Sequence, residues 1–93
     1  MNEEKEYIWL RLSGNNKYEG IRVASEVEHN SDAYHLEEDE FEICVMGSES
    51  LDNKSHEEIC DLIMININRL FIFSEDDSEQ LLEDVRSLAE GFI

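Results

Sequence analysis

The apolar residues of this chain repeat with two different periods, and this restricts the fold to one that combines strands with helices. In residues 7–12 they alternate, which places Ile8, Leu10 and Leu12 on one face and is typical of a strand. Towards the C-terminus they follow a helical spacing and form a single stripe of Leu81, Leu82, Val85, Leu88, Ala89 and Phe92. We therefore predict an α+β fold.

The segment after the first strand is expected to complete a hairpin. Residues 14–16 are Gly-Asn-Asn, which suit a turn, and residues 18–27 then predict the returning strand. A helical assignment competes with this one, because Ile21, Ala24 and Val27 also fit a helical spacing.

The rest of the predicted sheet lies before residue 50. Residues 29–32 are typical of a loop, and residues 33–36 fit neither a strand nor a helix pattern. Residues 41–46 alternate again and predict a further strand, which Gly47 would close. We expect a small antiparallel sheet of three to five strands with two helices packed on it.

Those two helices are predicted in the C-terminal half. Ser55 and Glu58 have the spacing of a capping box, and a helical apolar pattern follows them, so the first helix is expected to begin there. Residues 70–73 are either its last turn or a short buried strand, and we favour the strand. Ser74 and the acids after it suit the start of the strongly amphipathic last helix, and Gly91 suits its end.

Charge is the strongest functional signal in the sequence. The chain has 24 acidic residues and seven basic ones, which gives a formal net charge of −17 at pH 7. A small domain needs a net charge of only about 2–8 for solubility, and a larger excess opposes compaction through self-repulsion. We therefore expect the protein to bind a basic protein surface and to bind neither nucleic acid nor a membrane directly. The length of the chain predicts a single domain, residues 1–93.

The acids gather in two runs, residues 37–42 and residues 75–84. In the second run Glu75, Glu79 and Glu83 repeat every four residues, a spacing at which like charges destabilise a helix by a few tenths of a kcal/mol per pair. Carboxylates about 6 Å apart are similar in spacing to the phosphates of a nucleic-acid strand. The predicted partner-binding residues are Glu37, Glu38, Asp39, Glu40, Glu42, Glu75, Asp76, Glu79, Glu83 and Asp84.

Other uses of these side chains find less support. The acids of the last helix could simply be a solvated face that suits the helix dipole. Neither run has the central glycine or ligand spacing of a calcium loop, and His56 with Cys60 supplies too few ligands for zinc, so we expect no metal ion and no cofactor. The sequence lacks a phosphate-binding glycine loop, a G-x-S-x-G elbow and an H-E-x-x-H helix, so no enzymatic activity is expected.

One face of the first strand has two interpretations. Tyr7 and Trp9 lie opposite the apolar stripe, so they would be exposed if helices cover only one side of the sheet. They would then form a hydrophobic interface, which could serve a homodimer, whereas the alternative is a second small core. Cys44 and Cys60 fall in the predicted strand and helix and are expected to be reduced and to lie in or near the core.

A short, very acidic α+β chain with rows of carboxylates resembles the phage-encoded DNA-mimic proteins. These include inhibitors of uracil-DNA glycosylase, of restriction enzymes, of CRISPR effectors and of nucleoid proteins such as HU. The resemblance covers the size, charge and composition of the whole chain and includes no diagnostic motif. It implies a stoichiometric inhibitor whose carboxylates take the place of phosphates in the DNA-binding site of a basic host protein.

Two other classes of function remain open at this point. The first is an immunity protein or antitoxin that neutralises a cognate nuclease toxin, and the second is an acidic adaptor or structural subunit whose binding is insensitive to salt. Residues 1–6 precede no apolar run of signal-peptide length, and the apolar residues 59–73 are interrupted by polar ones. We therefore expect a cytoplasmic protein, located in the host cytoplasm if a phage encodes it.

Overall fold

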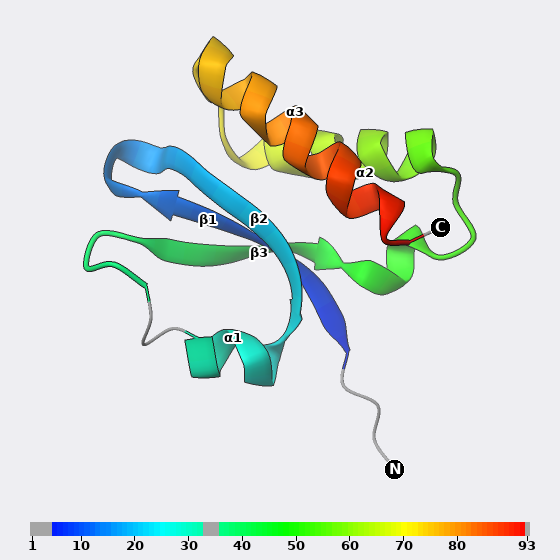
Figure 1. Ribbon diagram of the computed structural model, residues 1–93, viewed down its shortest axis with the longest axis horizontal. Helices are drawn as coiled ribbons and strands as arrows, with labels where there is room; N and C mark the ends of the chain where they lie inside the picture. Colours follow the sequence, from blue (N-terminus) through cyan, green and yellow to red (C-terminus); the bar gives the residue numbers. More distant parts are fainter. Residues whose placement is uncertain (1–4, 33–35, 93) are drawn as a thin grey trace.

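The computed structural model describes residues 5–32 and 36–92, and it confirms the predicted α+β fold. Three antiparallel strands form a sheet in the order β2-β1-β3, with two long helices on one face and a short helix on the other (Figure 1). In chain order the elements are β1 (Glu6–Ser13), η1 (Gly14–Asn16), β2 (Lys17–Ser25), α1 (Glu26–Asp32), β3 (Phe41–Gly47), η3 (Ser48–Leu51), α2 (His56–Leu70) and α3 (Glu75–Glu90). Of residues 33–36, whose pattern fits neither a strand nor a helix, residues 33–35 lie outside the described part of the chain.

The predicted hairpin forms from β1, η1 and β2. The turn is a short 3-10 segment in which Asn15 and Asn16 have φ angles of 67° and 57°, a region that asparagine tolerates better than most residues. The register pairs Ile8 with Val23 and Leu10 with Ile21, so the apolar stripe of β1 is extended across β2.

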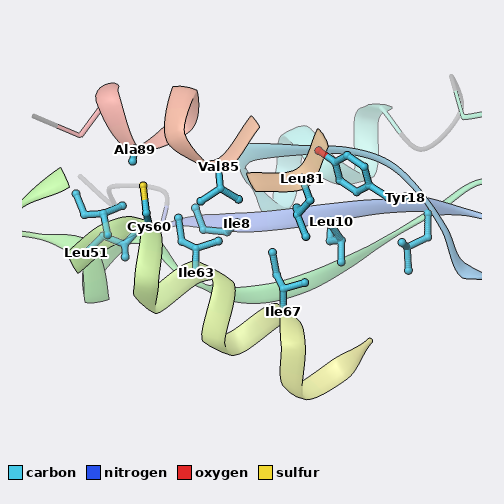
Figure 2. Close-up of a cluster of buried hydrophobic side chains, with 12 residues drawn as sticks. Ile8, Leu10, Tyr18, Leu51, Cys60, Ile63, Ile67, Leu81, Val85 and Ala89 are labelled. Carbon is cyan, nitrogen blue, oxygen red and sulfur yellow. The ribbon is translucent and has the colours of Figure 1, made fainter. Parts of the chain in front are cut away.

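The main core lies between the sheet and the helices α2 and α3 (Figure 2). The three predicted core residues of β1 are fully buried, as are the predicted helix positions that face them. These buried positions are Ile8, Leu10 and Leu12 on the strand, Ile59, Ile63 and Ile67 on α2, and Leu81, Val85 and Ala89 on α3.

Both long helices begin where their caps are predicted. The Ser55 side chain accepts a hydrogen bond from the Glu58 N–H, and the Glu58 carboxylate accepts one from the Ser55 N–H, so the capping box is complete. These hydrogen bonds lower the pKa of Glu58. The Ser74 side chain accepts from the Asp77 N–H at the start of α3.

The segment between the two helices is not the short strand that the sequence favoured. Helix α2 ends at Leu70, and residues 71–74 have no regular secondary structure. Phe71 and Phe73 pack against the core while Ile72 is exposed. This alternation is the pattern expected of a strand, which explains the prediction. Among the described residues the sheet contains only β1, β2 and β3, so this segment is not one of its strands; the chain reverses here and places α3 next to α2.

Helix α1 corrects two further predictions, the extension of the second strand to Val27 and the loop at residues 29–32. The strand ends at Ser25, whose side chain accepts from the Glu28 N–H at 3.1 Å while Glu28 accepts from the Ser25 N–H. This is a second S-x-x-E capping box with the same spacing as Ser55 and Glu58, and it was the signal that could have revealed the helix.

Helix α1 covers part of the second face of the sheet, and Trp9 is therefore buried rather than exposed. The Trp9 ring is 7% exposed, stacks on His29 at a centroid distance of 3.8 Å, and donates a hydrogen bond to the Ala24 carbonyl. Tyr7 is half-buried and contacts Trp9 edge to face. This face therefore contains the small second core and not an open hydrophobic interface.

The two cysteines differ in burial. Cys60 is buried in the main core, as predicted, and burial raises the pKa of its thiol. Cys44 is exposed, contrary to the prediction, because it pairs with Trp9 on the second face of the edge strand β3, which α1 covers only in part.

Candidate functional site

The structure brings the two acidic runs to the same end of the molecule, at the η1 turn (Figure 1). On one side of the turn, a Cβ added to Gly14 would lie 3.8 Å from the Asp39 carboxylate. On the other side, the Tyr18 N–H points at the Asp77 carboxylate at 3.4 Å. We define the acidic end as residues 37–40, the η1 turn and residues 75–77.

The carboxylates of α3 extend this surface along the helix. Glu75, Glu79 and Glu83 are exposed on the outer side of α3, because the apolar stripe of the same helix faces the core. Asp76 is exposed in the first turn, where negative charge favours the helix N-terminus. The negative charge of Asp76 stabilises the helix N-terminus. Glu75, Glu79 and Glu83 repel one another at their spacing of four residues and do not stabilise the helix.

The first acidic run forms a small closed turn before β3. The Glu40 N–H donates to the Glu37 carbonyl at 2.9 Å, and the Glu40 carboxylate accepts from the Glu37 N–H at 3.0 Å. Glu40 is half-buried by this arrangement, whereas Glu37, Glu38 and Asp39 are exposed. The three exposed carboxylates remain available to a partner.

Asp84 has a structural task within the fold. Its carboxylate accepts hydrogen bonds from the Tyr18 hydroxyl on β2 and from the Gln80 side chain on α3. Burial raises the pKa of Tyr18 well above its usual range, and the hydrogen bond and negative charge of Asp84 add to that rise. Asp84 is half-buried, and its hydrogen bond with Tyr18 joins α3 to β2. It therefore contributes less to the outer surface than predicted.

Glu42 does not belong to the outer acidic surface at all, because its side chain is only 1% exposed. Arg22 binds it with two hydrogen bonds of 2.9 and 2.8 Å, His29 Nδ1 lies 3.0 Å away, and Arg11 lies 3.6 Å away. Burial by itself would raise the pKa of Glu42. The hydrogen bonds from Arg22 and His29, with the charges of Arg22 and Arg11, outweigh that effect and lower the pKa.

Sequence reasoning missed this cluster of Arg11, Arg22, His29 and Glu42. Its members come from three strands and a helix, and the sheet register alone brings Arg11 opposite Glu42 and Arg22 opposite Trp9. The cluster joins α1 to the sheet and surrounds Glu42 with basic side chains, so the Glu42 carboxylate is not presented to a partner.

The acidic end also carries an exposed apolar side chain that the sequence analysis did not single out. Ile72, in the connector between α2 and α3, is 98% exposed, and the adjacent Leu70 is 52% exposed. Both line a surface hollow of about 370 Å³, and the other residues that line it are Asn16, Asn68, Arg69 and Phe71. Asn16 connects this hollow to the η1 turn, whereas Arg69 is the only charged side chain among the lining residues.

The described residues give no sign of a metal centre. Among residues 5–32 and 36–92, no group of three or more histidine, cysteine and acidic side chains is arranged to hold a metal ion. The two ring nitrogens of His56 are both engaged: Nε2 donates to the Arg86 carbonyl at 3.0 Å, and Nδ1 lies 3.9 Å from the Cys60 sulfur. This histidine thus contributes to the packing of α2 against α3.

Comparisons of the chain with protein-family models, with curated proteins and with solved structures gave no match. Within the described residues, no helix has both the length and the apolar character that crossing a membrane requires.

Proposed function

We propose that this protein is a stoichiometric inhibitor that acts as a DNA mimic. Its acidic end and the outer side of α3 would occupy the DNA-binding site of a basic protein. The observation that carries the proposal is the gathering of two acidic runs, distant in the sequence, on either side of the η1 turn with their carboxylates exposed. The exposed members of the predicted set are Glu37, Glu38, Asp39, Glu75, Asp76, Glu79 and Glu83.

Simple electrostatics explains how such a surface would inhibit. A groove that binds DNA is lined with lysine and arginine, and it attracts a particle with a net charge of −17 from a distance. Helical carboxylates about 6 Å apart can then pair with the groove cations in place of phosphates. The inhibition requires occupancy and no chemical step. We place this action in the cytoplasm, where nucleoid proteins, DNA glycosylases, restriction enzymes and CRISPR effectors work.

The test is direct binding to a defined panel of such proteins. Purified HU-type nucleoid protein, uracil-DNA glycosylase, a restriction endonuclease and a CRISPR effector nuclease would each be titrated with the protein by calorimetry. We expect at least one member to bind, duplex DNA to compete, and the affinity to fall steeply as salt shortens the Debye length from about 10 Å at 0.1 M. Binding that is insensitive to salt, or absent across the panel, would contradict the proposal.

Two variants with equal charge change separate a specific surface from net charge. In the first, Glu38, Asp39, Glu79 and Glu83 are changed to lysine; in the second, the exposed residues Glu49, Asp52, Glu57 and Asp61 are changed to lysine. We expect the first variant to lose about 100-fold or more in affinity and the second about 10-fold or less, since contact charges matter more than remote ones. Equal losses would mean that overall charge, and not the acidic end, determines binding.

A further inference from the structure

A hollow of about 250 Å³ lies beside the ion-pair cluster on the second face of the sheet. The residues that line it are Arg11, Gly20, Ile21, Arg22 and Glu42. The register explains their proximity, because Gly20 of β2, Arg11 of β1 and Glu42 of β3 lie opposite one another across the three strands. Arg22 is two residues from Gly20 on β2 and therefore lies on the same face. The hollow is thus located where a glycine omits a side chain next to two arginines.

The backbone conformation of β2 does not require a glycine at position 20. The φ angle of Gly20 is not positive, so the register shift beside it, between Arg11 and Leu12, is compatible with an ordinary residue. A Cβ added to Gly20 would meet no heavy atom within 4 Å, so a side chain would also fit. Glycine weakens the interior of a strand, and it often marks a place where a ligand comes close to the backbone.

Arg11 has hydrogen-bonding capacity that the fold does not use. Its Nη2 atom lies 3.6 Å from the Glu42 carboxylate, which is too far for a hydrogen bond. Its Nε atom is buried and has no hydrogen-bond partner among the described residues. Buried N–H groups almost always have such a partner, so the role of Arg11 is not explained by Glu42 alone. The Arg11 side chain as a whole is 36% exposed, so a molecule in the hollow can reach its guanidinium group.

The charges around the hollow select an anion. Two guanidinium groups and one carboxylate line it, which leaves a local excess of positive charge on a molecule whose net charge is −17. A water molecule could accept a hydrogen bond from Arg11 but would not compensate this charge. The oxygens of carboxylate and phosphate groups match a guanidinium group in both charge and geometry. The volume is below the roughly 300–1,000 Å³ of pockets for drug-sized ligands, so the anion must be small.

We propose that this hollow binds a small oxyanion, a carboxylate or phosphate group, which accepts hydrogen bonds from Arg11 and lies against the backbone at Gly20. Arg22 keeps its two hydrogen bonds to Glu42 and contributes positive charge. The inference does not rest on the proposed function, because no residue of the hollow belongs to the acidic end. The overall negative charge opposes the entry of an anion, so we expect a modest affinity, with a dissociation constant of roughly 1–10 mM.

The test is an NMR titration with inorganic phosphate and, separately, with acetate, at pH 7 and a constant ionic strength of about 0.2 M. Gly20→Leu is the decisive variant, because it fills the hollow and leaves every charge in place. Arg11→Gln removes the proposed donor. Arg69→Gln removes the same charge from an exposed arginine of α2 that lines a different hollow, and it is the matched control. Thermal unfolding of each variant would confirm that it remains folded, as expected for Gly20→Leu because the site has room for a side chain.

We expect at least one of the two anions to shift the amides of Arg11, Gly20 and Arg22 along a saturable curve. The anion that binds more tightly identifies the preferred group as phosphate or carboxylate. Gly20→Leu and Arg11→Gln should each weaken binding about 10-fold or more, and Arg69→Gln less than about 2-fold. The proposal is wrong if neither anion gives saturable shifts up to about 50 mM, if Gly20→Leu leaves the affinity unchanged, or if Arg69→Gln weakens binding as much as Arg11→Gln.

Discussion

Glu42 shows how one residue can change its role once the chain is folded. In the sequence it is part of an acidic run, but the fold buries it beneath Arg11, Arg22 and His29. A buried carboxylate in this position is retained because three donors compensate for its lost hydration. Removing its charge would take away the carboxylate that Arg11, Arg22 and His29 share.

We therefore expect Glu42→Gln to destabilise the protein by roughly 2–3 kcal/mol near neutral pH, because the substitution breaks its ion pairs. The loss is smaller than for a fully buried ion pair, since both arginines are partly exposed and solvent screens their charges. The folded pKa of Glu42 is below its ordinary value of 4.5, so its stabilisation is complete above that value and is lost as pH falls through the folded pKa. Urea unfolding of both proteins should give a difference that shrinks below about pH 4.5.

The exposed Glu37→Gln is the matched control, because this residue lies in the same acidic run but contacts no base among the described residues. The free energy of unfolding of this variant should differ little from that of the wild type near neutral pH. A Glu42→Gln difference that stays constant between about pH 7 and about pH 3 would contradict the assigned role of the ion pairs.

At the scale of elements, the fold uses one capping motif twice for different purposes. Ser55 and Glu58 begin the long helix α2, which the main core also stabilises, whereas Ser25 and Glu28 begin the seven-residue helix α1. A helix of that length is marginal by itself, so its cap, the Trp9–His29 stacking and the Glu42 ion pairs must hold it.

Ser25→Ala should therefore cost about 1 kcal/mol and act locally on α1. Hydrogen exchange would show faster exchange of the amides of α1, with those in α2 and α3 unchanged, because a short capped helix can open without global unfolding. Ser55→Ala serves as the comparison: it should cost a similar amount but leave exchange in α1 unaffected. Exchange that rises uniformly across the protein after Ser25→Ala would show that α1 is not an independent local unit.

At the scale of the whole molecule, the excess negative charge destabilises the folded state through self-repulsion. With 24 acids on 93 residues, the native state compresses many like charges into a body of about 36 × 32 × 20 Å. Only part of this charge is compensated by the Glu42 cluster and the helix caps. The remaining acids repel one another in the compact state and oppose folding.

Added NaCl should accordingly stabilise the protein. We expect the free energy of unfolding to rise by about 1–2 kcal/mol between about 0.01 and 0.5 M NaCl, because screening relieves repulsion in the compact state. A variant in which Glu38, Asp39, Glu79 and Glu83 are changed to glutamine or asparagine should be more stable at low salt and respond less to NaCl. Urea unfolding at each salt concentration gives both values, and a fall in stability with NaCl would contradict the repulsion argument.

Much of the fold could be predicted because it depends on residues close together in the chain. The strand alternation of residues 7–12, the stripe of α3 and the caps at Ser55 and Ser74 are all set within one or two turns of backbone. The same kind of local signal is present at Ser25 and Glu28, but the strand pattern of residues 18–27 runs past Ser25 and residues 29–32 have the composition of a loop, so α1 was not predicted.

The candidate site depended on the tertiary structure to a much greater degree. The sequence by itself determined that the protein is very acidic, that its acids occur in two runs and that its core joins a sheet to two helices. Only the tertiary structure decided that the runs meet at the η1 turn, that Glu42 and Trp9 are buried, and that Ile72 is presented to solvent. The physical reason is that strand order, register and helix packing join residues far apart in the chain, and local periodicity contains no information about those pairings.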